Sequence, residues 1–189
     1  MSIPPLNRST ETMNEKPIPE SYWVLPDLFL AGGYPALRYN EVGTRWRLSA
    51  FLSTGFDTFL DLTSPGDRPP YLSLLQEEAA VYETRLHYQR FSFPDFEVPG
   101  VEAIIAALNA IDAALADEHK LYLHCVGGIG RTGTTVGCWL VRHGMKPEAA
   151  LRHLNKIYLT SAQSLLFPHS PETEAQARFI LDWKEDGLA

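Results

Sequence analysis

The stretch Leu121-Tyr-Leu-His-Cys-Val-Gly-Gly-Ile-Gly-Arg-Thr-Gly133 predicts a β-strand that turns directly into a helix. Residues 121–123 form a short apolar run, three glycines follow the His124-Cys125 pair, and residues 134–141 suit a helix. Glycines let the backbone curl with its N–H groups inward, and a helix N-terminus adds positive potential at the same point. The stretch therefore predicts a phosphate-binding turn at the end of a strand.

Cys125 lies at the base of this turn, where positive potential favours its thiolate form. A thiolate attacks phosphorus. Arg131, six residues later, can return its planar guanidinium to two oxygens of a phosphoryl group and match the charge that spreads in the transition state. Thr132 would offer its hydroxyl to the sulfur and ease the departure of the sulfur in a second step.

The expected phosphate-binding set is the loop between the strand and the helix: Val126, Gly127, Gly128, Ile129, Gly130 and Arg131. His124 is expected to orient Cys125 from beneath rather than to act as a base, because the thiolate needs no base. The alternative is a core cysteine before a glycine-rich loop. That alternative explains neither the clustered glycines nor the arginine.

The pattern His124-Cys125-x5-Arg131-Thr132 resembles the signature of the cysteine-based protein tyrosine phosphatases, and Gly-Gly-x-Gly-Arg resembles their dual-specificity branch. The resemblance runs from about Trp23 to Trp183. It implies hydrolysis of phosphomonoesters on protein side chains through a phosphocysteine intermediate, with no metal and no cofactor.

The resemblance also implies a general acid on a loop opposite the phosphate cradle. Residues 93–99 are Phe-Pro-Asp-Phe-Glu-Val-Pro and resemble the Asp-x-x-x-Pro acid loop of the family. Asp95 takes the acid role by this match, and Phe96 would exclude water when the loop closes. Glu97 is the alternative acid. The alternative interpretation is that Asp95 and Glu97 are both ordinary solvent-exposed residues of a turn, without a catalytic role.

Strand-like and helix-like segments alternate along the chain. Strands are expected at 22–24, 28–31, 56–62, 86–91 and 121–124, and helices at 44–53, 72–84, 99–115, 134–143 and 147–158. Ser170 and Pro171 are expected to cap a last helix. This order predicts a single α/β domain over residues 21–185, with a central, mostly parallel sheet flanked by helices, after a flexible leader at residues 1–20.

The composition limits the partners of the chain. A formal net charge of −7 over 189 residues disfavours nucleic acid and anionic membranes. Two cysteines suit a reducing compartment, and no secretory signal or run of 18 apolar residues is present. The chain is therefore expected to be cytoplasmic, with a phosphorylated protein or peptide as its partner.

Several other polar residues have two interpretations. Cys138 is expected to pack in the helix after the loop, with a redox partnership to Cys125 as the alternative. Asp61 is expected to cap a turn, with a catalytic role as the alternative. Gln163 and Gln176 are open candidates for positioning the hydrolytic water. The remaining histidines are assigned to the surface: His87, His119, His143, His153 and His169.

The apolar side chains of Val126 and Ile129 are expected to line the mouth of the cradle and to suit a phenyl ring. We therefore expect phosphotyrosine to be preferred, with phosphoserine and phosphothreonine slower and phosphoinositides poor substrates. An approach of distant basic residues to the mouth would alter this preference, and the candidates are Arg68, Arg85 and Arg90. The other functional alternatives are a phosphoinositide or small-molecule phosphatase, a phosphate-binding module with weak turnover and a rhodanese-like sulfurtransferase.

Overall fold

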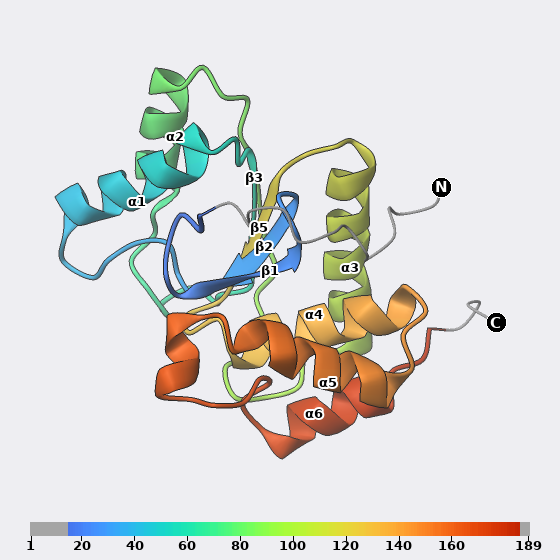
Figure 1. Ribbon diagram of the computed structural model, residues 1–189. Coiled ribbons are helices and arrows are strands. Elements are labelled where there is room, and N and C mark those ends of the chain that lie inside the picture. Colours follow the sequence, from blue (N-terminus) through green and yellow to red (C-terminus); the bar gives the residue numbers. More distant parts are fainter. Residues whose placement is uncertain (1–14, 186–189) are drawn as a thin grey trace.

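One sheet forms the centre of the computed structural model, which describes residues 15–185 (Figure 1). Its strands lie in the order β1-β2-β5-β3-β4. β1 runs antiparallel to β2, and the other neighbouring strands are parallel. The strands are β1 (Ser21–Leu25), β2 (Phe29–Gly32), β3 (Thr58–Asp61), β4 (His87–Arg90) and β5 (Leu121–His124). The predicted α/β class with a mostly parallel sheet is confirmed.

Helices cover both faces of this sheet (Figure 1). One face packs against α1 (Glu41–Ser53) and α2 (Leu72–Val81). The other face packs against the remaining helices, among which the 3-10 turn η1 (Ala162–Leu165) is inserted: α3 (Val101–Ala116), α4 (Gly130–Arg142), α5 (Pro147–Tyr158) and α6 (Glu174–Leu181). Within residues 15–185, no helix combines the length and apolar character that a membrane span requires.

The central strand β5 is buried on both faces because its side chains alternate between two cores. Leu121 and Leu123 belong to the core beneath α3 to α6. Tyr122 belongs to the core beneath α1 and α2, where its ring centroid lies 4.4 Å from that of Phe51. This double burial fixes the end of the strand, and with it the position of Cys125.

Helix α4, which follows the phosphate loop, is buried along residues 130–140. A helix buried on all sides belongs to the core. Cys138 lies within it and is fully buried, and this burial raises the pKa of its thiol. The predicted packing role of Cys138 is therefore confirmed, and the loop stands on a rigid element.

The N-terminal leader expected at residues 1–20 is described only from residue 15. Ile18 is 1% exposed and belongs to the core beneath α1 and α2. Lys16 donates a hydrogen bond from Nζ to the carbonyl of Ser21. Residues 15–20 thus pack on the domain, and the rest of the expected leader, residues 1–14, lies outside the described residues.

The start predicted for the last helix was wrong. Helix α6 is capped by Thr173, whose hydroxyl accepts the N–H of Gln176, while the Gln176 side chain accepts the N–H of Thr173. Ser170 does not cap a helix, because its hydroxyl donates to the carbonyl of Ile129 at 2.9 Å. The Ser170-Pro171 pair therefore supports the phosphate loop instead of starting a helix.

Candidate active site

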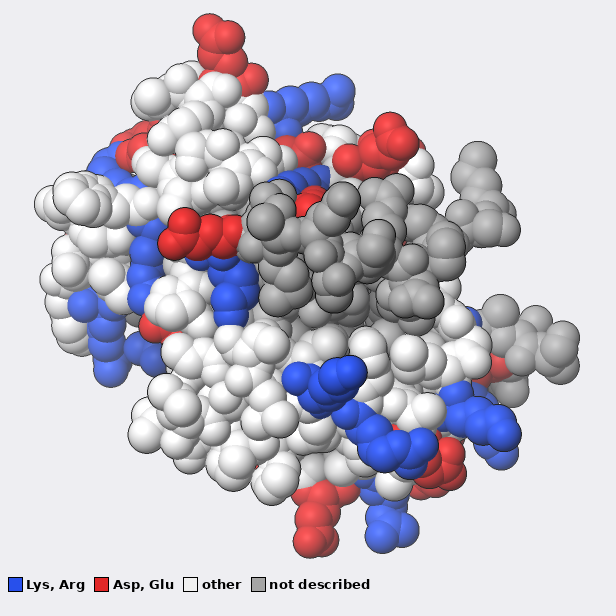
Figure 2. All heavy atoms as spheres, in the orientation of Figure 1, with Lys and Arg blue, Asp and Glu red and all other residues white. Residues whose placement is uncertain are grey.

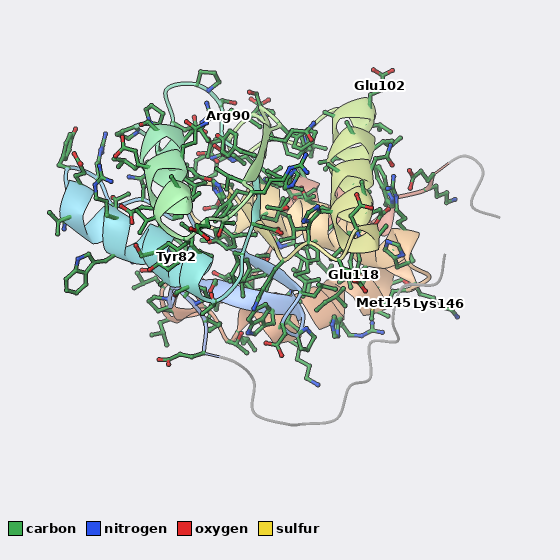
Figure 3. The ribbon with its side chains drawn as sticks, turned by 90° about the horizontal axis from the view of Figure 1, so that it is seen from above. Tyr82, Arg90, Glu102, Glu118, Met145 and Lys146 are labelled. Atoms are coloured by element: carbon green, nitrogen blue, oxygen red, sulfur yellow. The ribbon has the colours of Figure 1, made fainter. Side chains whose placement is uncertain are left out.

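The candidate site lies at the carboxyl edge of the parallel strands. β5 ends at His124, which pairs in register with Asp61 at the end of β3, and Asp61 pairs with Arg90 at the end of β4. In the view of Figure 3, Arg90 and Glu102 mark this edge, and Glu118 lies at the opposite end of the molecule. Loops that leave this edge supply the groups described below.

The loop after β5 aims a backbone donor at the sulfur of Cys125. The N–H of Gly128 donates to Cys125 Sγ at 3.3 Å, and Cys125 is 3% exposed. Gly128 has a φ of 74°, and a Cβ at this position would lie 2.3 Å from the carbonyl carbon of Gly32. Only glycine fits this backbone, because a side chain would be strained and would also collide with β2.

Other N–H groups of the loop are free to bind an anion. Within residues 15–185, no acceptor meets the N–H of Val126, Gly127 or Ile129. The loop is held through its carbonyl groups, because the N–H of Tyr34 donates to Val126 at 3.0 Å and Ser170 donates to Ile129. The carbonyl oxygens of Val126 and Ile129 are thus occupied by the protein, and the three amides stay available as a concave donor set.

Arg131 presents a free edge at the same loop. Its side chain is 1% exposed, and Nη1 donates to Asp67 Oδ2 and to the carbonyl of Phe93. The buried Nε and Nη2 atoms have no hydrogen-bond partner among the described residues. Nη2 lies 2.9 Å from Asp95 Oδ1, an ion-pair distance without hydrogen-bond geometry. An arginine edge with two N–H groups of this kind is able to bind a phosphate through two parallel hydrogen bonds.

The electrostatic surroundings keep Arg131 charged. Burial opposes the charged guanidinium, but Cys125, Asp67 and Asp95 favour it more strongly and raise the pKa of Arg131 above its ordinary value. Asp67 lies on the loop after β3 and carries no motif in the sequence. It is a site residue that the sequence analysis missed.

The acid loop after β4 faces Arg131. The Asp95 side chain is 46% exposed, and Phe96, with a φ of 59°, is also exposed. Gln176 from α6 is fully buried, and its Nε2 donates to the carbonyl of Glu97 at 3.2 Å. Gln176, an open candidate for positioning the hydrolytic water, therefore ties the acid loop to α6. Asp95 stands beside the loop, as its motif predicts.

His124 is enclosed beneath the loop. Its Nε2 is 2.6 Å from the hydroxyl of Tyr71, and its Nδ1 is 3.3 Å from the carbonyl of Cys125. Burial lowers the pKa of His124, although the carboxylate of Asp61, 3.9 Å from Nδ1, acts in the opposite direction. Burial thus favours the neutral form of the ring, which lies directly before Cys125 in the chain.

Asp61 is a fully buried hub for five hydrogen bonds. Its Oδ1 accepts from the N–H and hydroxyl of Thr63, which is the turn-capping role expected from the sequence. Its Oδ2 accepts from the hydroxyl of Tyr88 and from Nε and Nη2 of Arg90. These contacts also remove Arg90 from the candidates that reach the mouth of the site.

Other sequence-based assignments differ from the structure. Thr132 directs its hydroxyl to the carbonyl of Gly32 at 3.4 Å, and no hydrogen bond between the described atoms joins it to the sulfur. Its role in releasing the sulfur stays a prediction. Ile129 is 4% exposed and packs in the core, so only Val126 of the expected apolar pair reaches the mouth.

Two of the histidines assigned to the surface have acidic partners. Nδ1 of His119 lies 2.8 Å from Asp57, and Nε2 of His143 lies 2.9 Å from Asp112. These pairs are remote from Cys125 in the fold, since they lie at the amino end of β3 and at the end of α4. They stabilise the scaffold and take no part in the site.

Sequence comparison assigns the family. The family model Tc-R-P, described as a DSP-PTPase phosphatase of polymorphic toxin systems, matches residues 44–145, which is more than half of the chain. The matched segment contains Cys125, Arg131, Asp95 and Asp67. The protein therefore belongs to the cysteine-based protein tyrosine phosphatase superfamily, in its dual-specificity-like branch.

Individual relatives agree with this family. The protein tyrosine phosphatase domain-containing protein 1 of Mus musculus is 31% identical over 129 residues, 64% of this chain and 17% of the relative. The Arabidopsis thaliana phosphatidylinositol 3,4,5-trisphosphate 3-phosphatase and protein-tyrosine-phosphatase PTEN1 is 26% identical over 85% of this chain and 37% of its own length. The chain thus spans less than half of either relative.

A solved structure agrees in fold. The active form of Tk-PTP superposes with a TM-score of 0.66 and 22% identity, over 87% of this chain and 97% of that chain.

Proposed function

We propose that this protein hydrolyses phosphomonoesters in two steps. Cys125 Sγ attacks phosphorus and the bond to the leaving oxygen breaks, while Asp95 donates a proton to that oxygen. Water then attacks the phosphocysteine, Asp95 accepts a proton of the water, and the sulfur leaves as a thiolate. The observation that carries this proposal is the buried Nε and Nη2 edge of Arg131, which has no hydrogen-bond partner among the described residues and lies on the same loop as Cys125.

The proposed role of each residue follows from the charges that develop on the phosphoryl group and on the sulfur during the two steps. The N–H groups of residues 126–130 and the edge of Arg131 bind the phosphoryl oxygens, where charge is concentrated in the transition state. His124 orients Cys125 through the contact with its carbonyl, and Thr132 stabilises the sulfur as it leaves. No metal or cofactor has a place in this scheme.

The proposed substrate is phosphotyrosine in a protein or peptide, and the proposed compartment is the cytoplasm. A partly exposed Val126 beside the cradle supports an aromatic leaving group. The names of both sequence relatives include protein tyrosine phosphatase. The name of the Arabidopsis relative also includes a phosphoinositide. A phosphoinositide is therefore the alternative substrate.

The first test is hydrolysis of an aryl phosphate in the presence of EDTA. We expect Cys125→Ser to lower turnover to background while phosphate still binds, because the donors of the cradle lie on the backbone and on Arg131. Cys138→Ser is the matched control, since its thiol packs in α4. Turnover above a few per cent in Cys125→Ser would contradict the phosphocysteine path. Phosphate binding without turnover in the native chain would indicate a binding module.

The second test concerns the acid. Asp95→Asn should lower kcat on phosphotyrosine peptides by roughly 10²- to 10⁴-fold, and should affect aryl phosphates with good leaving groups less, because these depart without a proton. Glu97→Gln in the same loop is the control. Equal losses on both substrates would assign Asp95 a structural role and make Glu97 the candidate acid.

A further inference from the structure

A pocket of about 180 Å³ opens beside the phosphate loop. Val126 of the loop and Gln163 both form part of its wall. Its basic lining residues are Arg38, Arg47 and Arg68, which come from three different segments of the chain. In the view of Figure 2, Lys and Arg side chains gather on the flank that carries α1, with acidic side chains among them.

Two of these arginines lack a carboxylate partner within the described residues. Arg47 is paired with Glu20, whose two oxygens lie 3.0 and 3.1 Å from Nη2. Arg38 contacts the ring of Tyr39 at 5.3 Å from its centroid, and no ion pair among residues 15–185 includes Arg38 or Arg68. The pocket therefore holds uncompensated positive charge in a chain whose net charge is −7.

The pocket has a fixed position relative to the phosphate loop. Tyr34 forms both links: its N–H donates to the carbonyl of Val126 at 3.0 Å, and its hydroxyl donates to the carbonyl of Pro69 at 2.8 Å. Pro69 follows Arg68 directly, and Asp67, which holds Arg131, precedes it. Tyr34 thus links the backbone beside Arg68 to the phosphate loop.

A second pocket of about 410 Å³ continues from the first and shares Arg38 and Arg68 with it. Its walls are largely apolar: Leu37 lines both pockets, and Pro70 and Leu74 line only the second one. An anionic group beside Val126 would therefore be followed by room for an apolar side chain. A peptide has side chains for both pockets, whereas a soluble inositol polyphosphate has no group for the apolar one.

The acidic side of the mouth favours the same occupant. Asp67 and Asp95 flank Arg131. The carboxyl of Glu172 interacts electrostatically with both Asp95 and Arg131. A ligand with phosphates on every side would meet these carboxylates. A peptide places its anion on one side only, where Arg38 and Arg68 lie.

We infer that Arg38 and Arg68 form a second anion subsite, which binds an acidic or phosphorylated residue near the phosphotyrosine of a peptide substrate. The adjoining apolar groove binds a further side chain of the same peptide. This inference rests on the proposed phosphotyrosine activity and specifies its substrate class.

The test compares phosphotyrosine peptides that carry glutamate, phosphoserine or glutamine within two residues of the phosphotyrosine. We expect kcat/KM of the native chain to favour the anionic peptides roughly tenfold to a hundredfold, the range for a hydrogen bond between charged groups. In the double variant Arg38→Gln/Arg68→Gln, the ratio of anionic to neutral peptide should fall close to one. Arg85→Gln, at an exposed arginine remote from both pockets, should keep the native ratio.

The glutamate and phosphoserine peptides distinguish a carboxylate site from a phosphate site. A higher kcat/KM for the phosphoserine peptide than for the glutamate peptide would indicate that the subsite binds a dianion. An equal kcat/KM for the neutral and anionic peptides, or a preference that survives the double variant, would overturn the inference. A soluble inositol polyphosphate hydrolysed better than every peptide, with the same dependence on both arginines, would overturn the peptide occupant.

Binding to Cys125→Ser keeps this test separate from the test of turnover. The affinities of the three peptides for Cys125→Ser, with and without the two arginine substitutions, should show the same ratios. Loss of the ratios in binding contradicts the subsite. Absence of aryl phosphate hydrolysis in the native chain contradicts the proposed function instead.

Discussion

Asp67 fixes the orientation of Arg131 at the residue scale. Its carboxylate and the carbonyl of Phe93 both accept from Nη1, so the Nε and Nη2 edge of the guanidinium keeps its hydrogen-bonding capacity for a phosphate, although Nη2 also lies 2.9 Å from Asp95 Oδ1. An arginine held in this way loses less side-chain entropy when the substrate binds. Preorganisation of this kind contributes most when charge develops in a buried site.

We predict that Asp67→Asn lowers kcat/KM for aryl phosphates by roughly tenfold to a hundredfold, because it weakens a hydrogen bond between charged groups. Inhibition by inorganic phosphate should weaken in parallel, and Asp67→Glu should recover part of both. Glu118→Gln, at the opposite end of the molecule, is the control (Figure 3). Tighter phosphate binding in Asp67→Asn would show that Asp67 competes with the substrate for Arg131.

At the scale of elements, α6 holds the acid loop through one side chain. Gln176 joins two structures, because its Oε1 accepts the N–H of Thr173 and its Nε2 donates to the carbonyl of Glu97. A Cβ at Gly130 would lie 3.0 Å from the Gln176 amide, so this side chain also lies against the start of α4. Position 176 thus connects α6, the acid loop and the phosphate loop.

Thr173→Ala and Gln176→Ala separate these roles. Both changes weaken the cap of α6 and should lower the free energy of unfolding by about 1 kcal/mol. Only Gln176→Ala also frees the acid loop, and we expect it to lower kcat on phosphotyrosine peptides roughly twofold to tenfold, the worth of one neutral hydrogen bond. Equal kinetics in the two variants would contradict the link between α6 and the acid loop.

For the whole molecule, the buried pair His124 and Asp61 connects stability to pH. Burial lowers the pKa of His124 below its ordinary value. Burial opposes ionisation of Asp61, but His124 and the hydrogen bonds from Thr63 and Tyr88 outweigh it and lower its pKa. In the unfolded chain, His124 therefore takes up a proton at a higher pH than in the folded chain, and so does Asp61.

Both differences destabilise the fold as the pH falls. Below a pH of about 6.5, the unfolded chain binds a proton at His124 that the folded chain does not bind. The free energy of unfolding therefore falls by about 1.4 kcal/mol per pH unit until the pH passes the folded pKa of His124. The stabilisation from Asp61 is complete above its unfolded pKa of about 3.9 and is lost as the pH falls through the lower folded pKa.

We predict that the free energy of unfolding, measured with urea between pH 7.5 and 4.5, decreases more steeply for the native chain than for His124→Gln. The glutamine variant keeps a polar side chain under the loop but has no titrating ring. His169→Gln, at an exposed position, is the control and should follow the native curve. Identical slopes for the native chain and His124→Gln would show that the fold does not lower the pKa of His124.

The local pattern of residues 121–133 was sufficient to predict a strand that turns into a helix, and the fold confirms both elements. Anion binding by the loop between them stays a prediction. The alternation of strands and helices likewise predicted the α/β class and the edge of the sheet that carries the site. These features depend on interactions between near neighbours in sequence, namely apolar periodicity, glycine conformations and the polarity of a helix start. A single sequence displays such interactions directly.

Contacts between distant segments required the tertiary structure. Asp67 meets Arg131 across 64 positions and Gln176 meets Glu97 across 79, and no spacing rule relates such pairs. Ile129 was assigned to the mouth from its place in the loop, yet the packing of α4 buries it. Arg68 was named as a residue that would matter only if the fold brought it to the mouth, and it lines the pocket beside Val126. Sequence determines which groups a chain has for binding phosphate, whereas the packing of separate segments determines which other charges surround them.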